Sequence, residues 1–165
     1  MEKCFEQTGI ATEEMVKAKF PPMERINKGA VAVAECYQRI PCNPCQTACA
    51  FNAINVGEDI NNMPEVSFDA CRGCGICVSK CPGLAIMIID GSIEEATVDM
   101  HIPYEFLPLP EAGKTVKGVD RSGEYVCDVL VVDVKNPKSY DRTPVVRLRV
   151  PRERLYSVRN IRLED

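Results

Sequence analysis

The sequence predicts an α+β protein in which a small duplicated module precedes a small antiparallel β domain. Seven of the 10 cysteines gather in two short clusters, and an internal repeat relates one cluster to the other. From Lys114 onward, apolar and polar residues alternate in runs that are separated by turn residues, which is typical of β-strands. We therefore expect an N-terminal arm at residues 1–27, the module at 28–99, a Pro-rich connector at 100–113 and the β domain at 114–165.

The most informative stretch runs from Cys71 to Pro82 and spaces its cysteines as C-x2-C-x2-C-x3-C-P. A tight loop with this spacing can turn three thiolates onto one metal–sulfur cube, while the helix that follows carries the fourth cysteine to a second cube. Gly73 and Gly75 let the backbone bend where a side chain would collide. Pro82 has no N–H and prevents regular structure from continuing.

The other cluster, Cys42 to Cys49, repeats this pattern. The equivalent pairs, all at the same separation along the chain, are Cys42 and Cys74, Cys45 and Cys77, Cys49 and Cys81, and Ala53-Ile54 and Ala85-Ile86. Each copy then reads as strand, cysteine loop, short helix and strand. The repeat has one fault, because the residue equivalent to Cys71 is Arg39, which cannot bind a metal. The nearest thiol is Cys36, so the first copy reads C-x5-C-x2-C-x3-C.

These motifs resemble the bacterial-type ferredoxins that carry two [4Fe-4S] clusters. The resemblance implies a ferredoxin-like module with a pseudo-twofold axis and a crossed ligand set. Cluster 1 would be bound by Cys36, Cys42, Cys45 and Cys81. Cluster 2 would be bound by Cys71, Cys74, Cys77 and Cys49.

Cys36 is the least regular of these ligands. We interpret Ile40-Pro41 as part of a longer loop that returns Cys36 to cluster 1. In the alternative, Cys36 is a buried strand cysteine, and cluster 1 either has three irons or takes its fourth ligand from Cys4. Cys127 stands apart from the other thiols and is expected to be a small apolar core residue.

Other uses of the cysteines fit less well. A structural zinc site needs only two C-x2-C pairs, so the third and fourth cysteines of each motif would be superfluous. The charged N-terminus is not a secretory signal, and the longest apolar run, Leu84 to Ile89, is too short to span a bilayer. We therefore expect a cytoplasmic, reducing setting, where dense cysteines are metal ligands rather than disulfides.

Helix and strand signals flank the cysteine motifs. Thr12 can cap a helix that Pro21-Pro22 would end, and residues 30–36 alternate valine with alanine as a first strand. Residues 55–70 predict a hairpin. Leu84 to Ile89 is apolar throughout, so both faces of that strand should be covered. The β domain is expected to have about four strands. They would lie near Thr115-Val116, Tyr125 to Val134, Val146 to Val150 and Tyr156 to Leu163.

The charges divide unevenly along the chain. Residues 1–111 hold 8 basic and 16 acidic residues, whereas residues 112–165 hold 12 basic and 8 acidic ones. The acidic surface could steer toward a basic partner. The basic tail could dock an acidic partner or fold back on its acidic neighbour.

Electron transfer is the function that the sequence predicts, with no catalytic site and no small-molecule substrate site in this chain. The chain has one histidine, no paired carboxylate motif and no glycine-rich phosphate loop. Because more than half of the chain lies outside the module, we expect a subunit of a larger, flavin-dependent oxidoreductase rather than a free ferredoxin shuttle. More loosely, residues 35–45 resemble the small iron–sulfur subunits of FAD-dependent proline- or sarcosine-type dehydrogenases, which implies a flavoprotein partner.

A less favoured alternative is nucleic-acid binding with structural clusters. It would use Arg147, Arg149, Arg152, Arg154, Arg159, Arg162 and a stacking Tyr156.

Overall fold

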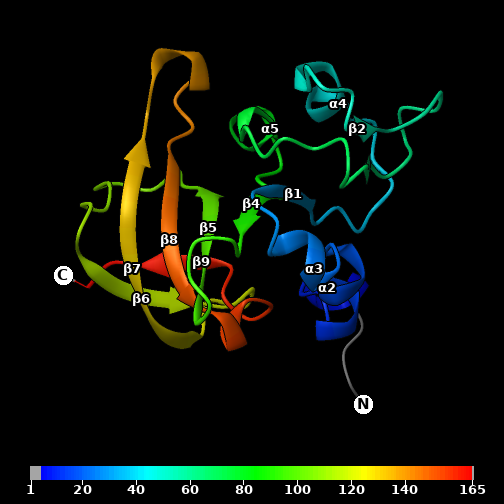
Figure 1. The fold of residues 1–165 in the computed structure, drawn as a ribbon. Helices are drawn as coiled ribbons and strands as arrows, with labels where there is room; N and C mark the ends of the chain where they lie inside the picture. Colours follow the sequence, from blue (N-terminus) through cyan, green and yellow to red (C-terminus); the bar gives the residue numbers. More distant parts are fainter. Residues whose placement is uncertain (1–4, 165) are drawn as a thin grey trace.

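An antiparallel sheet of seven strands forms the centre of the structure, a computed structural model that describes residues 5–164 (Figure 1). Its strands lie in the order β1 (Val31–Ala34), β4 (Ile86–Asp90), β5 (Thr97–Pro103), β8 (Val145–Pro151), β7 (Tyr125–Lys135), β6 (Thr115–Val119) and β9 (Asn160–Arg162). A second, two-stranded sheet pairs β2 (Ile54–Asn55) with β3 (Glu65–Val66). These elements confirm a small α+β fold with an antiparallel sheet.

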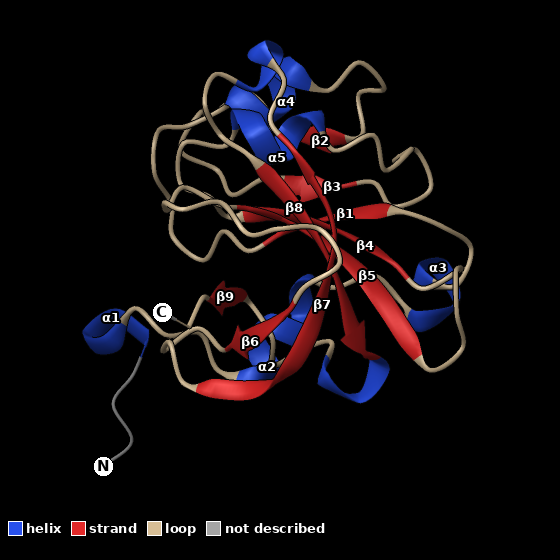
Figure 2. Ribbon diagram, turned by 90° about the vertical axis from the view of Figure 1, so that its left-hand side faces the viewer, coloured by secondary structure: helices blue, strands red, loops and turns tan. Residues whose placement is uncertain are grey.

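The helices are short and lie on the module side of the sheet. They are α1 (Phe5–Thr8), α2 (Glu13–Lys19), α3 (Met23–Ile26), α4 (Pro44–Ala48) and α5 (Ile76–Lys80), with 3-10 turns η1 (Lys138–Tyr140) and η2 (Arg152–Arg154). Helices α4 and α5 contact each other, and both views show them close together beyond the β1–β4 end of the sheet (Figures 1 and 2). No helix of residues 5–164 is long and apolar enough to cross a bilayer.

Helix α2 begins and ends as its sequence predicts. Thr12 is extended, and its side chain accepts a hydrogen bond of 3.3 Å from the Met15 N–H, which satisfies a donor that has no partner inside the helix. Glu13 and Lys17, one turn apart, form an ion pair on the exposed face. The helix ends at Lys19, before Pro21-Pro22, and buries Val16 against the core.

Strand β4 is covered on both faces and paired along both edges. Its apolar residues 86–89 are all buried, as the unbroken apolar run predicts. Along one edge Ile89 pairs with Val31 of β1, and along the other edge it pairs with Met100 of β5. Strand β4 therefore joins the cysteine-bearing part of the chain to the C-terminal strands.

The connector expected at residues 100–113 differs from the structure at its start. Residues 100–103 belong to β5, which pairs with β4 on one side and with β8 on the other. Val98, Met100 and Ile102 alternate along this strand and are buried, so burial of this face favours a strand. Pro103 ends the strand, opposite Val145, where it can be accommodated.

The C-terminal strands form at the expected places, but they do not make a separate sheet. The strands expected near residues 115, 125–134 and 146–150 are β6, β7 and β8. The last strand is shorter than expected, because η2 and a turn occupy the chain until β9 starts at Asn160. Since β8 pairs with β5, and β5 with β4, one sheet runs through both the module and the C-terminal part.

This continuity predicts a single cooperative unfolding transition. Met100→Ala removes a fully buried side chain from the middle of the sheet and should lower the free energy of unfolding by about 2–5 kcal/mol. Leu130→Ala, at a partly exposed position on β7, should lower it much less. Urea unfolding followed by far-UV circular dichroism measures both. Two resolved transitions, with Met100→Ala shifting only one of them, would contradict a shared sheet.

Candidate metal centre

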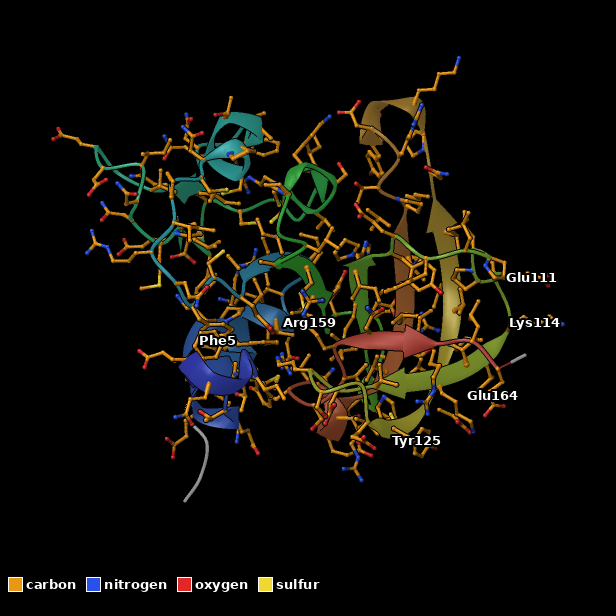
Figure 3. All side chains as sticks on the ribbon, turned by 180° about the vertical axis from the view of Figure 1, so that it is seen from behind. Phe5, Glu111, Lys114, Tyr125, Arg159 and Glu164 are labelled. Atoms are coloured by element: carbon orange, nitrogen blue, oxygen red, sulfur yellow. The ribbon has the colours of Figure 1, made fainter. Side chains whose placement is uncertain are left out.

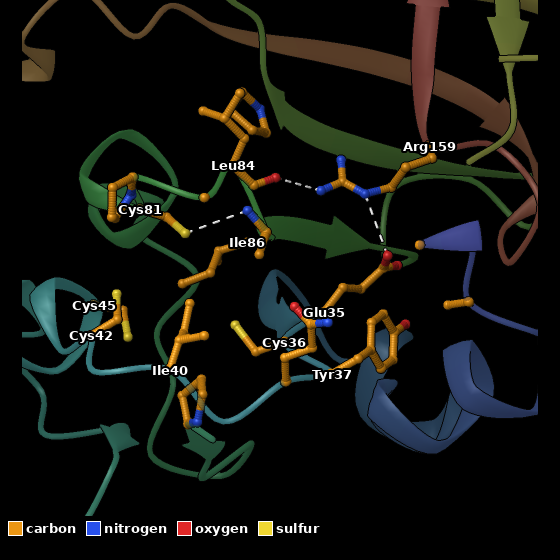
Figure 4. A pocket seen from close by; sticks show the side chains of 18 of the residues that line it. Glu35, Cys36, Tyr37, Ile40, Cys42, Cys45, Cys81, Leu84, Ile86 and Arg159 are labelled. Atoms are coloured by element: carbon orange, nitrogen blue, oxygen red, sulfur yellow. Dashed lines mark hydrogen bonds and ion pairs between the residues drawn. The ribbon is translucent and has the colours of Figure 1, made fainter. Parts of the chain in front are cut away.

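Two cavities are each lined by four cysteines of the module. The first cavity, of about 530 Å³, is lined by Cys36, Cys42, Cys45 and Cys81, among other residues (Figure 4). The second, which is much tighter, is lined by Cys49, Cys71, Cys74 and Cys77. The structure thus brings together the same two groups of four that the ferredoxin resemblance implies. Within residues 5–164, no three His, Cys, Asp or Glu side chains converge closely enough to hold a single metal ion.

Short helices deliver one cysteine of each group from the other half of the repeat. Cys45 lies on α4 and lines the first cavity, whereas Cys49, at the C-terminal end of α4, lines the second. Cys77 on α5 lines the second cavity, and Cys81 at the end of α5 lines the first. Because α4 and α5 contact each other, each helix end lies close to the opposite cavity.

The backbone has the same shape after the two helices. Cys49 and Cys81 are both extended, with φ of −81° and −78°. Three residues later, Asn52 and Leu84 are both left-handed, with φ of 51° and 53°. Leucine seldom adopts this conformation, so the turn is imposed by its surroundings.

Backbone N–H groups donate to several of the cysteine sulfurs. The N–H groups of Ala53 and Ala85 donate to the sulfurs of Cys49 and Cys81, at 3.3 and 3.4 Å. The Cys71 sulfur accepts two such bonds, from the N–H groups of residues 32 and 73, at 3.3 and 3.4 Å. Hydrogen bonds of this kind to cysteine sulfurs help set the potential of an iron–sulfur cluster. Four sulfur donors around each cavity, some of them held by N–H groups, fit a cubane cluster.

Burial raises the pKa of two of these thiols well above the ordinary value of a cysteine. The pKa of Cys77 rises to about 12 and that of Cys36 to about 11, mainly by desolvation and then by neighbouring thiols. Those neighbours include Cys49 for Cys77 and Cys81 for Cys36, each from the opposite helix end. At neutral pH these two thiols stay protonated as long as no metal cluster is bound. Binding of a cluster would therefore release protons.

Glycine is required at residue 73 for two separate reasons. Its φ of +64° lies in the left-handed region, and a Cβ there would come within 2.3 Å of the Ala30 Cβ and 2.5 Å of the Ala30 carbonyl oxygen. The loop that carries Cys71 and Cys74 therefore packs directly against the chain entering β1. Gly75, with φ of +80°, starts α5 in the same left-handed region.

The irregular first copy of the repeat is clear in the structure. Arg39, which stands where a ligand would be expected, points to the neighbouring loop and donates to the Asn62 side chain at 2.8 Å. Cys36 lines the first cavity instead. Cys4, the alternative ligand, lies outside the described residues. Cys127 lies half-buried on β7 and lines neither of the two cavities.

Several charged residues at the site could not be identified from the sequence. Glu35, next to Cys36, is buried and forms ion pairs with Arg121 and Arg159. Arg25 donates to the carbonyl oxygen of Cys71 at 3.0 Å. The sequence indicated only that an acidic first part of the chain could contact a basic C-terminal part. That difference in charge does not identify which arginines bind Glu35.

Gly73→Ala should prevent the second group of four cysteines from binding a metal cluster. The new methyl group would meet the Ala30 backbone, so the loop must move and its cysteines with it. Iron per chain should fall by about half if each of the two cysteine groups binds a cluster of about four irons. Gly113→Ala is the matched control, because Gly113 has a similar φ of +85° but no heavy atom within 4 Å of the added Cβ. Equal iron loss in both variants would contradict the packing argument.

Known proteins match part of the chain. Residues 64–87 match the family model Fer4, the 4Fe-4S binding domain. The chain is 46% identical over 54 residues to the ferredoxin-type protein NapF of Haemophilus influenzae, which covers 32% of this chain and 31% of that protein. It is 39% identical over 57 residues to one subunit of the Na⁺-translocating ferredoxin:NAD⁺ oxidoreductase complex of Acetobacterium woodii, covering 34% of this chain and 16% of that subunit.

A further match is Protein Pixie of Drosophila melanogaster, 35% identical over 69 residues, which is 38% of this chain and 11% of that protein. The chain thus spans less than a third of the length of each of these curated relatives. No solved structure matches it. The matches establish that the chain contains a ferredoxin-type 4Fe-4S module, the electron-transfer module of iron–sulfur proteins.

Proposed function

We propose that the chain binds two [4Fe-4S] clusters and transfers electrons through them. The observation that carries the proposal is the crossing of the two helix ends, Cys49 into the second cavity and Cys81 into the first. A single cluster would need only one of these groups of four. The clusters would supply one-electron chemistry, and the contact between α4 and α5 would hold them close enough for electron exchange.

The backbone supports a duplicated two-cluster module. Cys49 and Cys81, which are equivalent positions of the sequence repeat, share one conformation, and so do Asn52 and Leu84. Matching hydrogen bonds to the two cysteine sulfurs have the same sequence separation. Such agreement at left-handed, non-glycine positions favours two copies of one structural unit, related by the predicted pseudo-twofold axis. In this arrangement Cys36 would be the fourth ligand of the first cluster.

We further propose that the chain is the electron-transfer subunit of a larger, cytoplasmic oxidoreductase. Large apolar side chains are exposed beside both cavities: Ile40 and Phe106 at the first, Phe51 and Ile76 at the second. Exposed apolar groups around a redox centre suit contact with a protein partner. A flavoprotein of the amino-acid dehydrogenase type remains the partner that residues 35–45 favour. A free ferredoxin shuttle is the second candidate.

Nucleic-acid binding has less support. Arg149 pairs with the buried Asp99 at 2.9 Å, and Arg159 pairs with Glu35 at 3.4 Å. Arg152 donates to backbone carbonyl oxygens, including that of Gly91 at 2.8 Å. Much of the basic run is therefore engaged within the chain rather than presented to a phosphate backbone.

Iron analysis of paired cysteine variants tests the crossed ligand sets. Wild-type protein prepared without oxygen should contain about eight irons per chain. Cys49→Ser combined with Cys74→Ser removes two ligands from the same cluster and should leave about four. Cys49→Ser combined with Cys42→Ser damages both clusters and should leave far fewer. Cys127→Ser is the control, since Cys127 lines neither cavity. Equal iron loss in the two double variants would contradict crossing.

Purification from the native source distinguishes the subunit from the shuttle. A subunit should elute in a complex whose partner carries a flavin, with flavin and iron in constant ratio across the peak. Replacing the exposed Phe106 with Ser should weaken that complex because apolar contact area is lost, whereas Leu107→Ser, exposed but not lining the first cavity, should have a smaller effect. Elution as a lone brown monomer would favour the shuttle.

A further inference from the structure

A buried group of charges lies against the first cavity. Glu35 directly precedes Cys36, and only 5% of its side chain is exposed. Arg121 holds the Glu35 carboxylate with two N–H groups, one of them at 2.9 Å, and Arg159 approaches the same carboxylate at 3.4 Å. Both arginines come from the C-terminal part of the chain, 86 or more residues from Glu35.

Arg159 also binds the other side of the cavity. A second N–H of its guanidinium donates to the Leu84 carbonyl oxygen at 2.6 Å (Figure 4). Leu84 occupies the left-handed turn that follows Cys81, and the next residue, Ala85, donates its N–H to the Cys81 sulfur. The Ala85 carbonyl oxygen in turn accepts the Glu35 N–H at 2.8 Å. One guanidinium thus joins the segments that carry Cys36 and Cys81.

The arginines are themselves fixed in the C-terminal part of the structure. The guanidinium of Arg121 donates to the Tyr156 carbonyl oxygen at 2.8 Å. The backbone N–H of Arg159 donates to the Val119 carbonyl oxygen, also at 2.8 Å. From behind, Arg159 lies at the junction between the C-terminal strands and the module (Figure 3). Arg121 lies in the turn after β6 and Arg159 directly before β9, so these hydrogen bonds tie both residues to the ends of sheet strands.

Cys36 lacks the local support that the second group's equivalent ligand has. Cys71 receives two N–H bonds on its sulfur and a guanidinium on its carbonyl oxygen. Within residues 5–164, the sulfur of Cys36 accepts no such backbone bond. Five residues separate Cys36 from Cys42, where only two separate Cys71 from Cys74, so the first loop is longer and orders at a larger entropic cost.

We propose that Glu35, Arg121 and Arg159 form a clasp that positions Cys36 and Cys81 around the first cluster. The C-terminal part of the chain would then supply the support that the irregular first loop lacks. Arg159 is the positioning residue that joins both sides, because it contacts the carboxylate beside one ligand and the turn beside the other. The inference rests on the proposed two-cluster assignment and assigns a role to residues outside the cysteine motifs.

Arg159→Lys tests the clasp in the intact, cluster-loaded protein. Lysine keeps the charge but cannot bind the carboxylate and the Leu84 carbonyl oxygen together in the planar geometry of a guanidinium. Loss of one charge-assisted hydrogen bond should make opening of the site about tenfold more frequent. Under mild ferricyanide oxidation, the first cluster should lose iron about tenfold faster, with a three-iron signal growing in the electron paramagnetic resonance spectrum.

Arg149→Lys is the matched control. Arg149 also pairs a buried carboxylate, that of Asp99, within the same sheet, but it lines neither cysteine cavity. It should lower the thermal midpoint to a similar extent while leaving the oxidation rate at its wild-type value. Glu35→Gln, which weakens contacts with both arginines, should accelerate iron loss in the same direction as Arg159→Lys.

Two outcomes separate the clasp from the assignment on which it rests. If wild-type protein holds about eight irons but Arg159→Lys and Glu35→Gln lose iron no faster than Arg149→Lys, the clasp is overturned. If wild-type protein holds only about four irons, the two-cluster assignment fails first. Faster iron loss in the two clasp variants alone supports the proposal.

Discussion

The pairing of β4 along both edges is the constraint on which the remaining geometry depends. Strand β4 starts five residues after Cys81, and its partner β1 ends two residues before Cys36. The ladder between them therefore sets where both thiols enter the first cavity. A slip of one residue would turn every side chain of β4 to the opposite face. The close packing of residues 86–89 on both faces and the ladder with β5 along the other edge oppose such a slip.

The features that the sequence predicted are those set by residues close together in the chain. The spacing of Cys71, Cys74 and Cys77 is set by a tight turn and one short helix, so the motif can be recognised from a short stretch of sequence. Thr12 caps its helix because the donor lies three residues away. The pairing of Glu35 with Arg121, by contrast, spans 86 residues. Nothing in a short window of sequence distinguishes that arginine from others nearby, because the pair depends on the sheet that brings the two segments together.

Proline explains the misplaced boundary at residue 100. Pro103, Pro108 and Pro110 exclude a helix, and together they suggested an extended connector. Proline is nevertheless compatible with the end of a strand, where a ladder hydrogen bond is not needed. The apolar residues Val98, Met100 and Ile102, at every second position, were the competing signal. The meaning of this signal depends on whether β8 is available as a partner, and β8 lies far along the chain, beyond the β6–β7 hairpin.

The segments outside the cysteine motifs contribute guanidinium groups beside both cavities. Arg25, from the N-terminal arm, binds the Cys71 carbonyl oxygen beside the second cavity, and Arg159, from the C-terminal part, binds the Leu84 carbonyl oxygen beside the first. Four thiolates converging on a buried cluster concentrate negative charge where water is scarce, which is costly unless positive groups and donors lie nearby. A duplicated loop can supply backbone N–H groups, but it contains few cations: Arg72 and Lys80 are the basic residues between Cys71 and Cys81. Chain segments added on both sides of the module can supply them, which gives those segments a physical reason to pack against the module even though they carry none of the paired cysteine motifs.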